Sequence, residues 1–475
     1  MAGSLQTTPG VAITPSSVKA TLPTNYITNF DFLTQYLPDT YEAEFERYGN
    51  RSISSFLRMV GAELPTNYDL IKWAEQGRLH TKYQAMVASA YAAGAETFTM
   101  AGAPATGMVF RVNQTVFLSS DQAAAESAKG VITAVTANSF TVAYYEDTGA
   151  ASPFTVATTT VTAFVYGYEF KKGSEGMKGS LEAEDSIFSC KPIIIKDNYE
   201  VSGSDMAQVG WVEVTTENGA TGYLWYLKSE HETRLRFDDY LEMAMVEGVP
   251  AEGTSAAEAF LSTNVGAAGA DAGNAGTEGM FDTIENRGNV WSGGNPAALA
   301  DFDTIVQRLD KQGAIAENVL FLNRQFSFDI DDMLAAQNSY GAGGTSYGLF
   351  DNSEEMALNL GFSGFKRGYE FYKTDWKYLN DATLRGGLTG GAVNGVLVPA
   401  GTTSVYDQVL GKNAKRPFLH VRYRASEAED RRYKTWMTGS AGGAMSNDID
   451  KMQVNFLSER ALCVMGANNF VLFKG

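Results

Sequence analysis

From about residue 31 to residue 91, hydrophobic positions recur mostly at helical spacing, whereas the residues before them show no such pattern. Residues 1–30 are polar and proline-containing, without a sustained period, which predicts an extended arm. Over residues 31–60, apolar side chains recur at three- and four-residue steps, which predicts two short helices. The same spacing predicts a further helix from about residue 67 to 91, although Gly77 interrupts it.

The pattern changes to short β-branched and aromatic runs over residues 98–170. Gly, Asn, Asp and Ser separate these runs, and Gly and Ala flank the region as a whole. The pattern predicts a small barrel or sandwich of five or six strands, inserted into the surrounding chain. The predicted strands are 108–112, 115–118, 130–135, 139–144 and 161–165.

A charged segment and a long amphipathic helix follow. Residues 171–185 are charged and lead into a strand at Ile193–Ile195, which favours the return limb of a long exposed β-hairpin. A helix is predicted over residues 221–248, ending at Gly248, and about 25 residues would make it roughly 38 Å long. Its apolar stripe is Phe237, Tyr240, Leu241, Ala244 and Met245, extended by Leu224 and Leu227.

The C-terminal half alternates between helical and strand patterns. Residues 251–298 are rich in Ala and Gly and are interpreted as a mobile loop. Two closing strands, 452–457 and 469–473, are joined through residues 458–465. This mixture predicts an α/β or α+β domain. Between the loop and the closing strands, helices are predicted near 302–309 and 330–334 and strands at 319–322, 369–372 and 395–399.

Composition places the chain among soluble globular proteins. Of its 475 residues, 44% are hydrophobic and 19% are charged, which is enough to build real cores. The charge balance is 37 − 55 = −18, and such an acidic chain repels duplex DNA on average, which argues against a dedicated DNA-binding protein. No apolar run approaches the ~18 residues of a membrane span, and residues 1–20 lack the apolar core of a signal peptide. We therefore expect a cytosolic setting, or export without the Sec pathway.

The chain has two cysteines, Cys190 and Cys463, and both lie among apolar neighbours. Two cysteines so far apart in sequence do not form a disulfide framework, so buried reduced thiols are expected. The close cluster of ligands that a zinc site needs is absent from the sequence.

Motifs for catalysis are almost absent. Walker A, Gly-x-Gly-x-x-Gly, His-Glu-x-x-His and EF-hand patterns do not occur. Residues 344–348 match the nucleophile elbow Gly-x-Ser-x-Gly around Ser346, with His420 downstream. The polar and glycine-rich residues 337–343 lack the pattern of the buried strand that an elbow requires, so we interpret the match as chance in a glycine-rich chain. The acids between Ser346 and His420 include Asp351 and Asp407, and the remaining histidines are His80 and His231.

Two kinds of charged cluster were weighed as binding sites. Acidic groups could hold a divalent cation, but helix starts and solvated surface explain them equally well. A basic run over residues 415–434 could face phosphate, but pairing with Glu427, Glu429, Asp430 or a neighbouring subunit is favoured in so acidic a chain. No catalytic, cofactor-binding or metal-binding residue is therefore assigned. The acidic groups are Asp301/Asp303, Asp329/Asp331/Asp332 and Asp448/Asp450, and the basic run contains Lys415, Arg416, Arg422, Arg424, Arg431, Arg432 and Lys434 with Tyr423 and Tyr433 between them.

The order of these features resembles the major capsid protein of tailed bacteriophages, with the Hong Kong 97-type shell fold. Residues 193–204 resemble the hairpin return of that fold, and Tyr223–Val246 would be its spine helix. Residues 395–402 and 455–462 resemble late segments of these proteins. The whole sequence is also similar to capsid proteins of crAss-like phages, which infect gut Bacteroidetes.

The resemblance implies an α+β, Hong Kong 97-like capsid fold with an inserted β-module. It consists of an N-terminal arm, an E-loop hairpin, a P-domain with the spine helix, and an A-domain. The implied regions are 1–60 (arm and short helices), 61–97 (P-domain start and E-loop lead-in), 98–168 (inserted β-module), 169–200 (E-loop return), 201–250 (P-domain with spine helix), 251–425 (A-domain, with the loop 251–298) and 426–475 (closing strands).

The implied function is that of a major capsid protein. Copies would form pentamers and hexamers of an icosahedral head, assembled in the host cytoplasm and enclosing double-stranded DNA. The expected partners are the chain itself, portal, scaffold or decoration proteins, and packaged DNA held non-specifically, with no membrane and no cofactor. The charge of −18 would let DNA slide along the inner wall. The alternatives are another phage or surface-layer structural subunit and a serine hydrolase that uses Ser346.

Overall fold

The computed structural model describes most of the chain after the N-terminal segment. The predicted arm and short helices over 1–60, and the Ser346 motif, lie outside the described residues. The described part divides into two compact units. Unit 1 contains residues 194–243 and 430–458, and unit 2 contains residues 62–193, 244–429 and 459–475. The described residues are 62–78, 80–92, 94–100, 108–121, 126–146, 151–154, 160–179, 185–207, 214–215, 221–222, 225–251, 255–264, 276–337, 363–407, 412–441 and 446–475.

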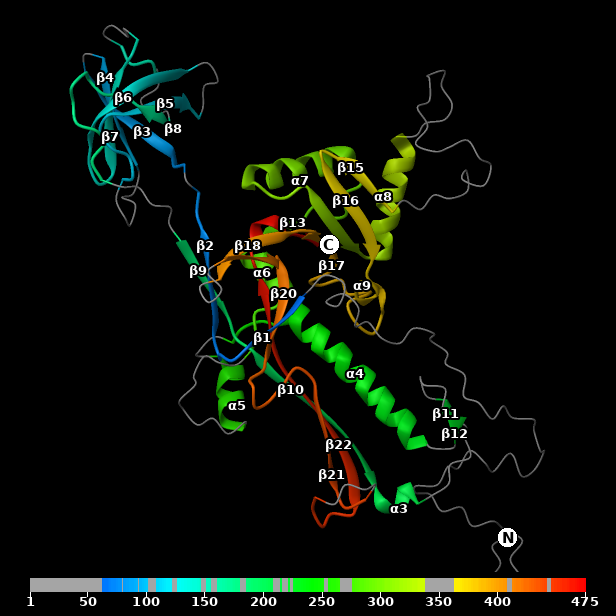
Figure 1. Cartoon of the computed structure of the whole chain (residues 1–475). Coiled ribbons are helices and arrows are strands. Elements are labelled where there is room, and N and C mark those ends of the chain that lie inside the picture. Colours follow the sequence, from blue (N-terminus) through cyan, green and yellow to red (C-terminus); the bar gives the residue numbers. More distant parts are fainter. Residues whose placement is uncertain are drawn as a thin grey trace, which may run out of the picture. The chain divides into compact units, whose positions relative to one another are not determined.

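Unit 1 packs a long helix on a three-stranded sheet. Strand β22 (Lys451–Val464) lies between β10 (Ile193–Ser202) and β21 (Lys434–Gly439), and helix α4 (Trp225–Glu247) lies along this sheet (Figure 1). Side chains in a strand alternate between faces, so every second residue of β22 points toward the helix. The shared core is Phe237, Leu241, Met452, Val454 and Phe456.

Short elements complete unit 1. Helix α3 (Gly203–Met206) follows β10 and is capped by Ser202, whose Oγ accepts a hydrogen bond from the amide of Asp205. Strands β11 (Val214–Thr215) and β12 (Thr221–Gly222) form a two-stranded pair before α4.

A six-stranded mixed sheet forms the main core of unit 2. Its strand order is β13-β23-β17-β14-β16-β15, with parallel pairing at β13–β23 and β14–β16. Helices α7 (Leu299–Gln312) and α8 (Arg324–Gln337) bury their apolar sides against it. The strands are β13 (Asn289–Trp291), β14 (Glu317–Leu322), β15 (Gly364–Arg367), β16 (Tyr369–Asp375), β17 (Val393–Pro399) and β23 (Val471–Lys474).

Unit 2 also contains smaller strand pairs and short helices. In unit 2, β20 pairs with β1 in parallel and with the second part of β22 in antiparallel fashion. Strands β2 (Ile71–Gln76) and β9 (Asp185–Cys190) form a separate two-stranded ribbon. The other elements are β1 (Ala62–Thr66), α5 (Ala256–Asn264), α6 (Met280–Arg287), α9 (Lys377–Asn380), β18 (Thr402–Asp407), β19 (Lys412–Pro417), β20 (Leu419–Arg424) and the 3-10 turn η3 (Ala467–Asn469).

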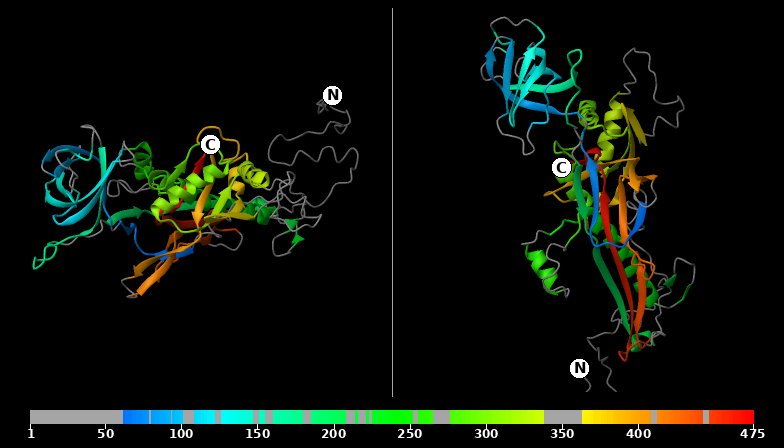
Figure 2. Two further views of the ribbon diagram at one scale, coloured as in Figure 1. Left: turned by 90° about the horizontal axis from the view of Figure 1, so that it is seen from above. Right: turned by 60° about the vertical axis from the view of Figure 1, so that its left-hand side comes forward.

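The predicted β-module is a closed six-stranded barrel, coloured blue to cyan in Figures 1 and 2. Its strand order is β3-β4-β7-β6-β5-β8, and its interior is filled by aromatic and aliphatic side chains. The Phe140 ring lies 5.6 Å from that of Phe98 and 5.1 Å from that of Phe110. Its strands are β3 (Lys82–Ala92), β4 (Ala95–Thr99), β5 (Gln114–Ser120), β6 (Ser127–Val135), β7 (Ser139–Tyr144) and β8 (Thr160–Tyr168).

Gly130 is the point in the barrel where a side chain has no room. A Cβ there would lie 2.4 Å from the carbonyl oxygen of Ala143 on the neighbouring strand. Glycine lets β6 and β7 approach each other closely, which helps a small barrel to close.

The mixed α+β class and the barrel are confirmed, but several elements differ from the prediction. The helix predicted over 67–91 is wrong: this stretch forms β2 and the greater part of β3. Exposure alternates along β2, so its true period is two, and the three- and four-residue spacing of apolar residues is coincidental. The barrel therefore begins at Lys82, earlier than residue 98, and residues 108–112 are not a strand although Phe110 is buried.

Corrections also apply to the C-terminal half. Helix α4 begins at Trp225, after Thr221–Gly222 has formed β12, and Tyr240 is exposed rather than part of the buried stripe. The segment 251–298 contains α5, α6 and β13, so it is not a loop throughout. The first closing strand continues as a single 14-residue strand, β22, whose residues 458–464 are all buried. Three of them are polar, and their partners are the backbone carbonyl oxygen of Arg432 for Ser458, Arg424 for Glu459 and Glu63 for Arg460.

Candidate functional site

The β2–β9 ribbon has two different faces. In its antiparallel register, Ile71 pairs with Cys190 and Trp73 pairs with Phe188. Because side chains alternate along a strand, these four side chains share one face. Ile71 and Cys190 are buried, whereas Ile187, on the opposite face, is 71% exposed. The ribbon is therefore fixed by one face and presents the other to solvent.

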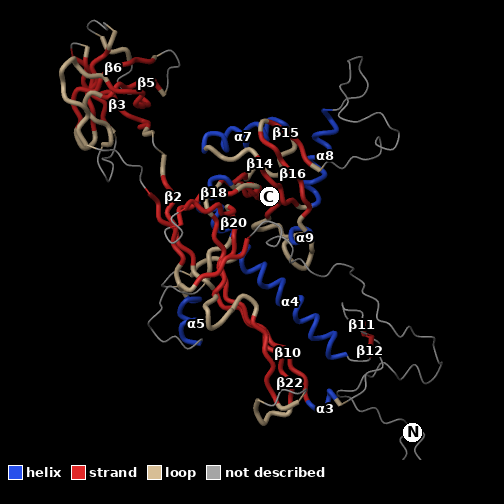
Figure 3. The backbone as a smooth tube through the Cα atoms, viewed as in Figure 1, coloured by secondary structure: helices blue, strands red, loops and turns tan. Residues whose placement is uncertain are grey.

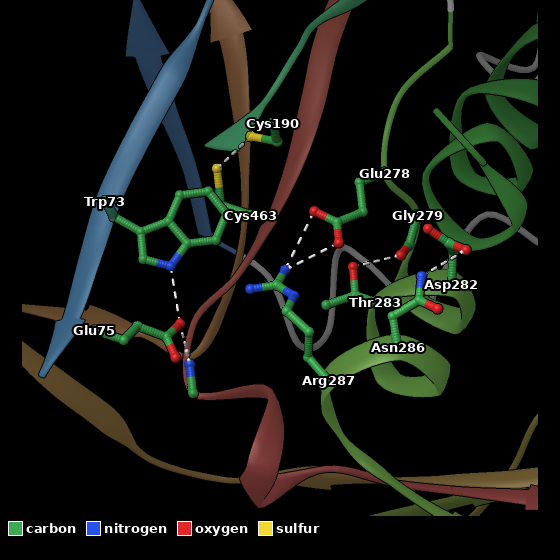
Figure 4. Close-up of polar contacts among 11 residues, drawn as sticks. Trp73, Glu75, Cys190, Glu278, Gly279, Asp282, Thr283, Asn286, Arg287 and Cys463 are labelled. Atoms are coloured by element: carbon green, nitrogen blue, oxygen red, sulfur yellow. Dashed lines mark hydrogen bonds and ion pairs between the residues drawn. The ribbon is translucent and has the colours of Figure 1, made fainter. Parts of the chain in front are cut away.

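Arg287, in the last turn of α6, holds the inner face of the ribbon. Its Nη2 donates to both carboxylate oxygens of Glu278, at 3.1 and 3.2 Å. Its guanidinium carbon lies 4.2 Å from the ring centroid of Phe188 and 5.7 Å from that of Trp73. Figure 4 shows the carboxylate, the guanidinium and the Trp73 indole side by side. A buried cation that meets both a carboxylate and aromatic faces fixes the ribbon to α6.

Glu75 makes a second connection, to the turn that follows β22. Its Oε1 accepts hydrogen bonds from the indole Nε1 of Trp73 and from the backbone amide of Gly466, each at 2.9 Å (Figure 4). Gly466 has a φ of 61°, a left-handed conformation that glycine adopts without strain. We call Trp73, Glu75, Phe188, Glu278 and Arg287 the hairpin-root cluster.

Burial sets the electrostatics of this cluster. Glu278 and Arg287 have side chains only 18% and 16% exposed. Burial raises the pKa of Glu278 above its ordinary value, and the attraction of Arg287 opposes that rise without cancelling it. The free-energy cost of removing the charged Glu278 carboxylate from water therefore exceeds the stabilisation that Arg287 gives it. Arg287 binds the carboxylate of Glu278, and the indole of Trp73 and the amide of Gly466 bind that of Glu75, which is the arrangement of a structural anchor.

The two cysteines are brought together beside the hairpin-root cluster. The Sγ atoms of Cys190 and Cys463 lie 3.2 Å apart, and the two residues are 3% and 1% exposed. The prediction of free, buried cysteines is confirmed. Their proximity was not predicted, because 273 positions separate them in the sequence.

The predicted hydrolase residues do not form a described site. Ser346 and Asp351 lie outside the described residues, and the side chain of Asp407 is likewise not described. His420 is 3% exposed on β20, with Nδ1 3.3 Å from the carbonyl oxygen of Pro417. His80 is exposed, and His231 is half-buried on α4.

The first acidic group has structural uses, as expected. Asp301 accepts hydrogen bonds from the amides of Ala297 and Ala298 at the start of α7. Asp303 forms an ion pair with Arg367 that lowers the pKa of the carboxyl group.

The other acidic groups fit the same interpretation. Asp329 accepts a hydrogen bond from Asn295 and Asp331 pairs with Lys373, while Asp332 is exposed. Asp448 and Asp450 are also exposed. Within the described ranges, no three His, Cys, Asp or Glu side chains are grouped so as to hold a metal ion.

One member of the basic run, Arg424, pairs with acids other than those expected. Arg424 forms ion pairs with Asp69 at 2.6 Å and Glu459 at 3.7 Å. Lys434 lies 5.7 Å from the ring centroid of Trp436. The side chains of Lys415 and Arg416 are not described. Arg424 is therefore used within the fold, with partners distant in sequence.

Sequence reasoning missed the hairpin-root cluster. Glu278 and Arg287 lie in the segment that was interpreted as a loop, and Trp73 and Glu75 lie in the predicted helix. The two-residue alternation of Ile71, Trp73 and Glu75 was the available signal for the ribbon. The partners across the fold had no local signal.

Comparison with known proteins gives remote structural likenesses only. No family model matches the sequence, and no curated protein matches it either. In the described part of the chain, helices are too short or too polar to span a bilayer.

The similar solved structures include several from phages and one from a GTA particle. One from Mycobacterium phage Ogopogo is 8% identical, with a TM-score of 0.40, covering 93% of this chain and 98% of its own. One from Microbacterium phage Oxtober96 is 11% identical, with a TM-score of 0.39, covering 94% and 99%. The capsid of a native GTA particle is 10% identical, with a TM-score of 0.37, covering 95% and 98%. Values this low do not establish a family.

Proposed function

We propose that the chain is a self-assembling capsid subunit of a tailed bacteriophage. The observation that carries the proposal is the β2–β9 ribbon, which the hairpin-root cluster fixes on one face while the other face carries the 71% exposed Ile187. A two-stranded ribbon is marginally stable by itself. Anchoring such a ribbon so firmly is useful if its open face binds a neighbouring copy.

The sequence resemblance supports the same proposal. The segments that resemble the hairpin return and the spine helix correspond to β10 and α4, which pack together in unit 1. We assign β2 to the E-loop lead-in and β9 to its return, with the barrel as an insertion between them.

The finer proposal follows from that resemblance. Copies form pentamers and hexamers of an icosahedral head around double-stranded DNA, in the virion of a phage of the crAss-like group. Assembly takes place in the host cytoplasm, and portal, scaffold or decoration proteins join the shell. The charge of −18 keeps contact with the packaged DNA non-specific.

Assembly is tested on the purified full-length chain by native mass spectrometry and negative-stain electron microscopy across a concentration series. Rings of five or six, sheets or hollow shells are expected. A chain that stays monomeric or dimeric at every concentration, also when co-expressed with the head proteins encoded beside it, contradicts the proposal.

The role of the ribbon is tested by Ile187→Asp. A charge placed in an apolar interface should raise the concentration needed for assembly by about tenfold or more. Ser189→Asp is the matched control, since Ser189 lies on the same exposed face of β9 and is already polar. Both variants should keep the wild-type circular dichroism and melting temperature. If Ile187→Asp and the wild type assemble at the same concentration, the contact between copies does not involve this face of the ribbon.

A further inference from the structure

Cys190 and Cys463 come from strands that belong to different sheets. Cys190 ends β9 of the two-stranded ribbon, and Cys463 lies in β22 of the five-stranded sheet. No backbone ladder joins these two strands to each other. Their Sγ atoms nevertheless lie 3.2 Å apart, and Figure 4 shows the two side chains pointing toward each other.

The surroundings of the pair are apolar. Cys190 and Cys463 form one buried cluster with Ile71 and Ala461, and Trp73 packs against it. A disulfide is neutral and carries no hydrogen-bond donor, so oxidation would leave no buried thiol proton without an acceptor.

We propose that Cys190 and Cys463 form a reversible intrachain disulfide that fastens the β2–β9 ribbon to the long C-terminal strand. The bond would act in parallel with the hairpin-root cluster, on the same inner face of the ribbon. It would close a loop of the chain between residues 273 positions apart, and such long loops lose much conformational freedom in the unfolded state.

Because the pair is buried, the oxidant that reaches it has to be small, and hydrogen peroxide meets this requirement.

The two thiols differ in their electrostatic surroundings. The contact with Cys190, together with His420 and Arg422, lowers the pKa of Cys463 in spite of burial. The contact with Cys463 and burial raise the pKa of Cys190, with Glu278 adding to the rise and Arg422 opposing it. His420 lies directly opposite Cys463 in the β20–β22 ladder, and we assign the first attack to Cys463.

The reaction balances in two steps. The Cys463 thiolate attacks hydrogen peroxide, which breaks the O–O bond and gives a sulfenic acid and hydroxide. The proton that Cys463 released converts the hydroxide into water. The Cys190 sulfur then attacks the Cys463 sulfur and displaces a second water, with its own proton leaving in that water. Two thiols have given two electrons to one peroxide.

A bound soft metal is the other use of paired cysteines. Such a site needs further protein ligands, and among the described residues no set of three His, Cys, Asp or Glu is placed to supply them. The disulfide uses only the two groups that are already in contact.

The biological setting rests on the proposed function. A capsid subunit made in a reducing cytoplasm would keep both thiols free during assembly, and the bond would form after release into an oxidising medium. The thiol chemistry itself is measured on the unassembled chain, so its failure and a failure to assemble are separate results.

The experiment treats the reduced, unassembled full-length chain with hydrogen peroxide, quenches with catalase, and then alkylates in denaturant. We expect an intact mass lower by two hydrogen atoms, loss of both alkylation sites, and a proteolytic peptide pair joined through Cys190 and Cys463. Dithiothreitol should restore both sites. The oxidised chain should melt at a higher temperature than the reduced chain.

Single variants test the order of the steps. In Cys190→Ala, Cys463 keeps His420 and Arg422 but loses the contact that lowers its pKa most, so it should oxidise more slowly than in the wild type and form no link. In Cys463→Ala, the Cys190 thiol should remain alkylatable under the same treatment. Neither variant should change its melting temperature on oxidation as the wild type does. The proposal is overturned if wild-type chains keep both thiols, oxidise them separately without a link, or link different chains. The wild-type mass decides these outcomes even where a variant does not fold.

Discussion

Arg287 shows how one side chain can fasten a ribbon that lacks a third strand. Its planar guanidinium places two hydrogen bonds on Glu278 while its carbon centre lies 4.2 Å from the Phe188 ring centroid. A lysine ammonium has neither the planar fork nor the flat face that stacks on an aromatic ring. The residue type therefore follows from the need to satisfy a carboxylate and two rings at once.

Glu278 leads to a prediction for pH dependence. Its pKa in the folded chain is raised by burial, although Arg287 opposes the rise. A carboxyl group with a raised pKa binds its proton more tightly in the folded state. Its contribution to stability is therefore complete below the unfolded-state pKa and is lost as pH rises through the folded-state pKa.

The variant that isolates this effect is Glu278→Gln, which keeps an acceptor for Arg287 but cannot ionise. As pH rises from about 4.5, the ordinary pKa of the residue, wild type should lose unfolding free energy relative to the variant. Urea unfolding of both proteins at a series of pH values gives the difference. A difference that stays constant with pH, or moves the other way, would show that Arg287 outweighs burial.

At the scale of single elements, α4 depends on a narrow contact with the sheet of unit 1. Phe237 is fully buried, and its ring lies 5.5 Å from that of Tyr433 and 5.7 Å from that of Phe456. Tyr240, three residues later on the same helix, is 46% exposed. The helix therefore presents a narrower apolar stripe than the sequence pattern suggested.

This difference is measurable by a pair of alanine variants. Phe237→Ala should reduce the free energy of unfolding by about 3–5 kcal/mol, because it leaves a cavity between helix and sheet. Tyr240→Ala should change it by no more than about 0.5 kcal/mol. Denaturant unfolding followed by circular dichroism compares the two. If both variants lose a similar amount of unfolding free energy, Tyr240 is part of the buried stripe after all.

Local patterns predicted the elements whose period is clear, and failed where a contact distant in sequence decides. Strand β7 was predicted at its observed bounds, since alternation and flanking turn residues are both local. Strand β2 was mistaken for helix because a coincidental three- and four-residue spacing hid its two-residue alternation, and its partner Arg287, more than 200 positions away in the sequence, gave no local signal. The pairing of Cys190 with Cys463 had no local signal either. The apolar stripe predicted the long helix, but no local pattern predicted the cluster that holds the ribbon.

At the scale of the whole molecule, strands are prominent among the described residues (Figure 3), and the barrel and the six-stranded sheet have separate cores. Every residue of the barrel core lies between positions 83 and 165. The core of the six-stranded sheet is drawn from residues 291–473. Because the two cores share no side chain, we expect them to unfold independently, as separate cooperative units.

Hydrogen exchange on two matched variants tests that independence. Phe140→Ala removes a fully enclosed barrel ring, and Phe371→Ala removes its counterpart in the six-stranded sheet, each at a cost of about 3–5 kcal/mol. Both residues are 1% exposed, so the two changes are comparable in burial. Phe140→Ala should accelerate exchange in β3 to β8 and leave β14 and β16 protected, and Phe371→Ala should do the reverse. If either variant loosens both sets of strands equally, the cores unfold as one unit. The separate outcome would mean that the barrel can change in sequence without weakening the sheet, which is what an inserted module requires.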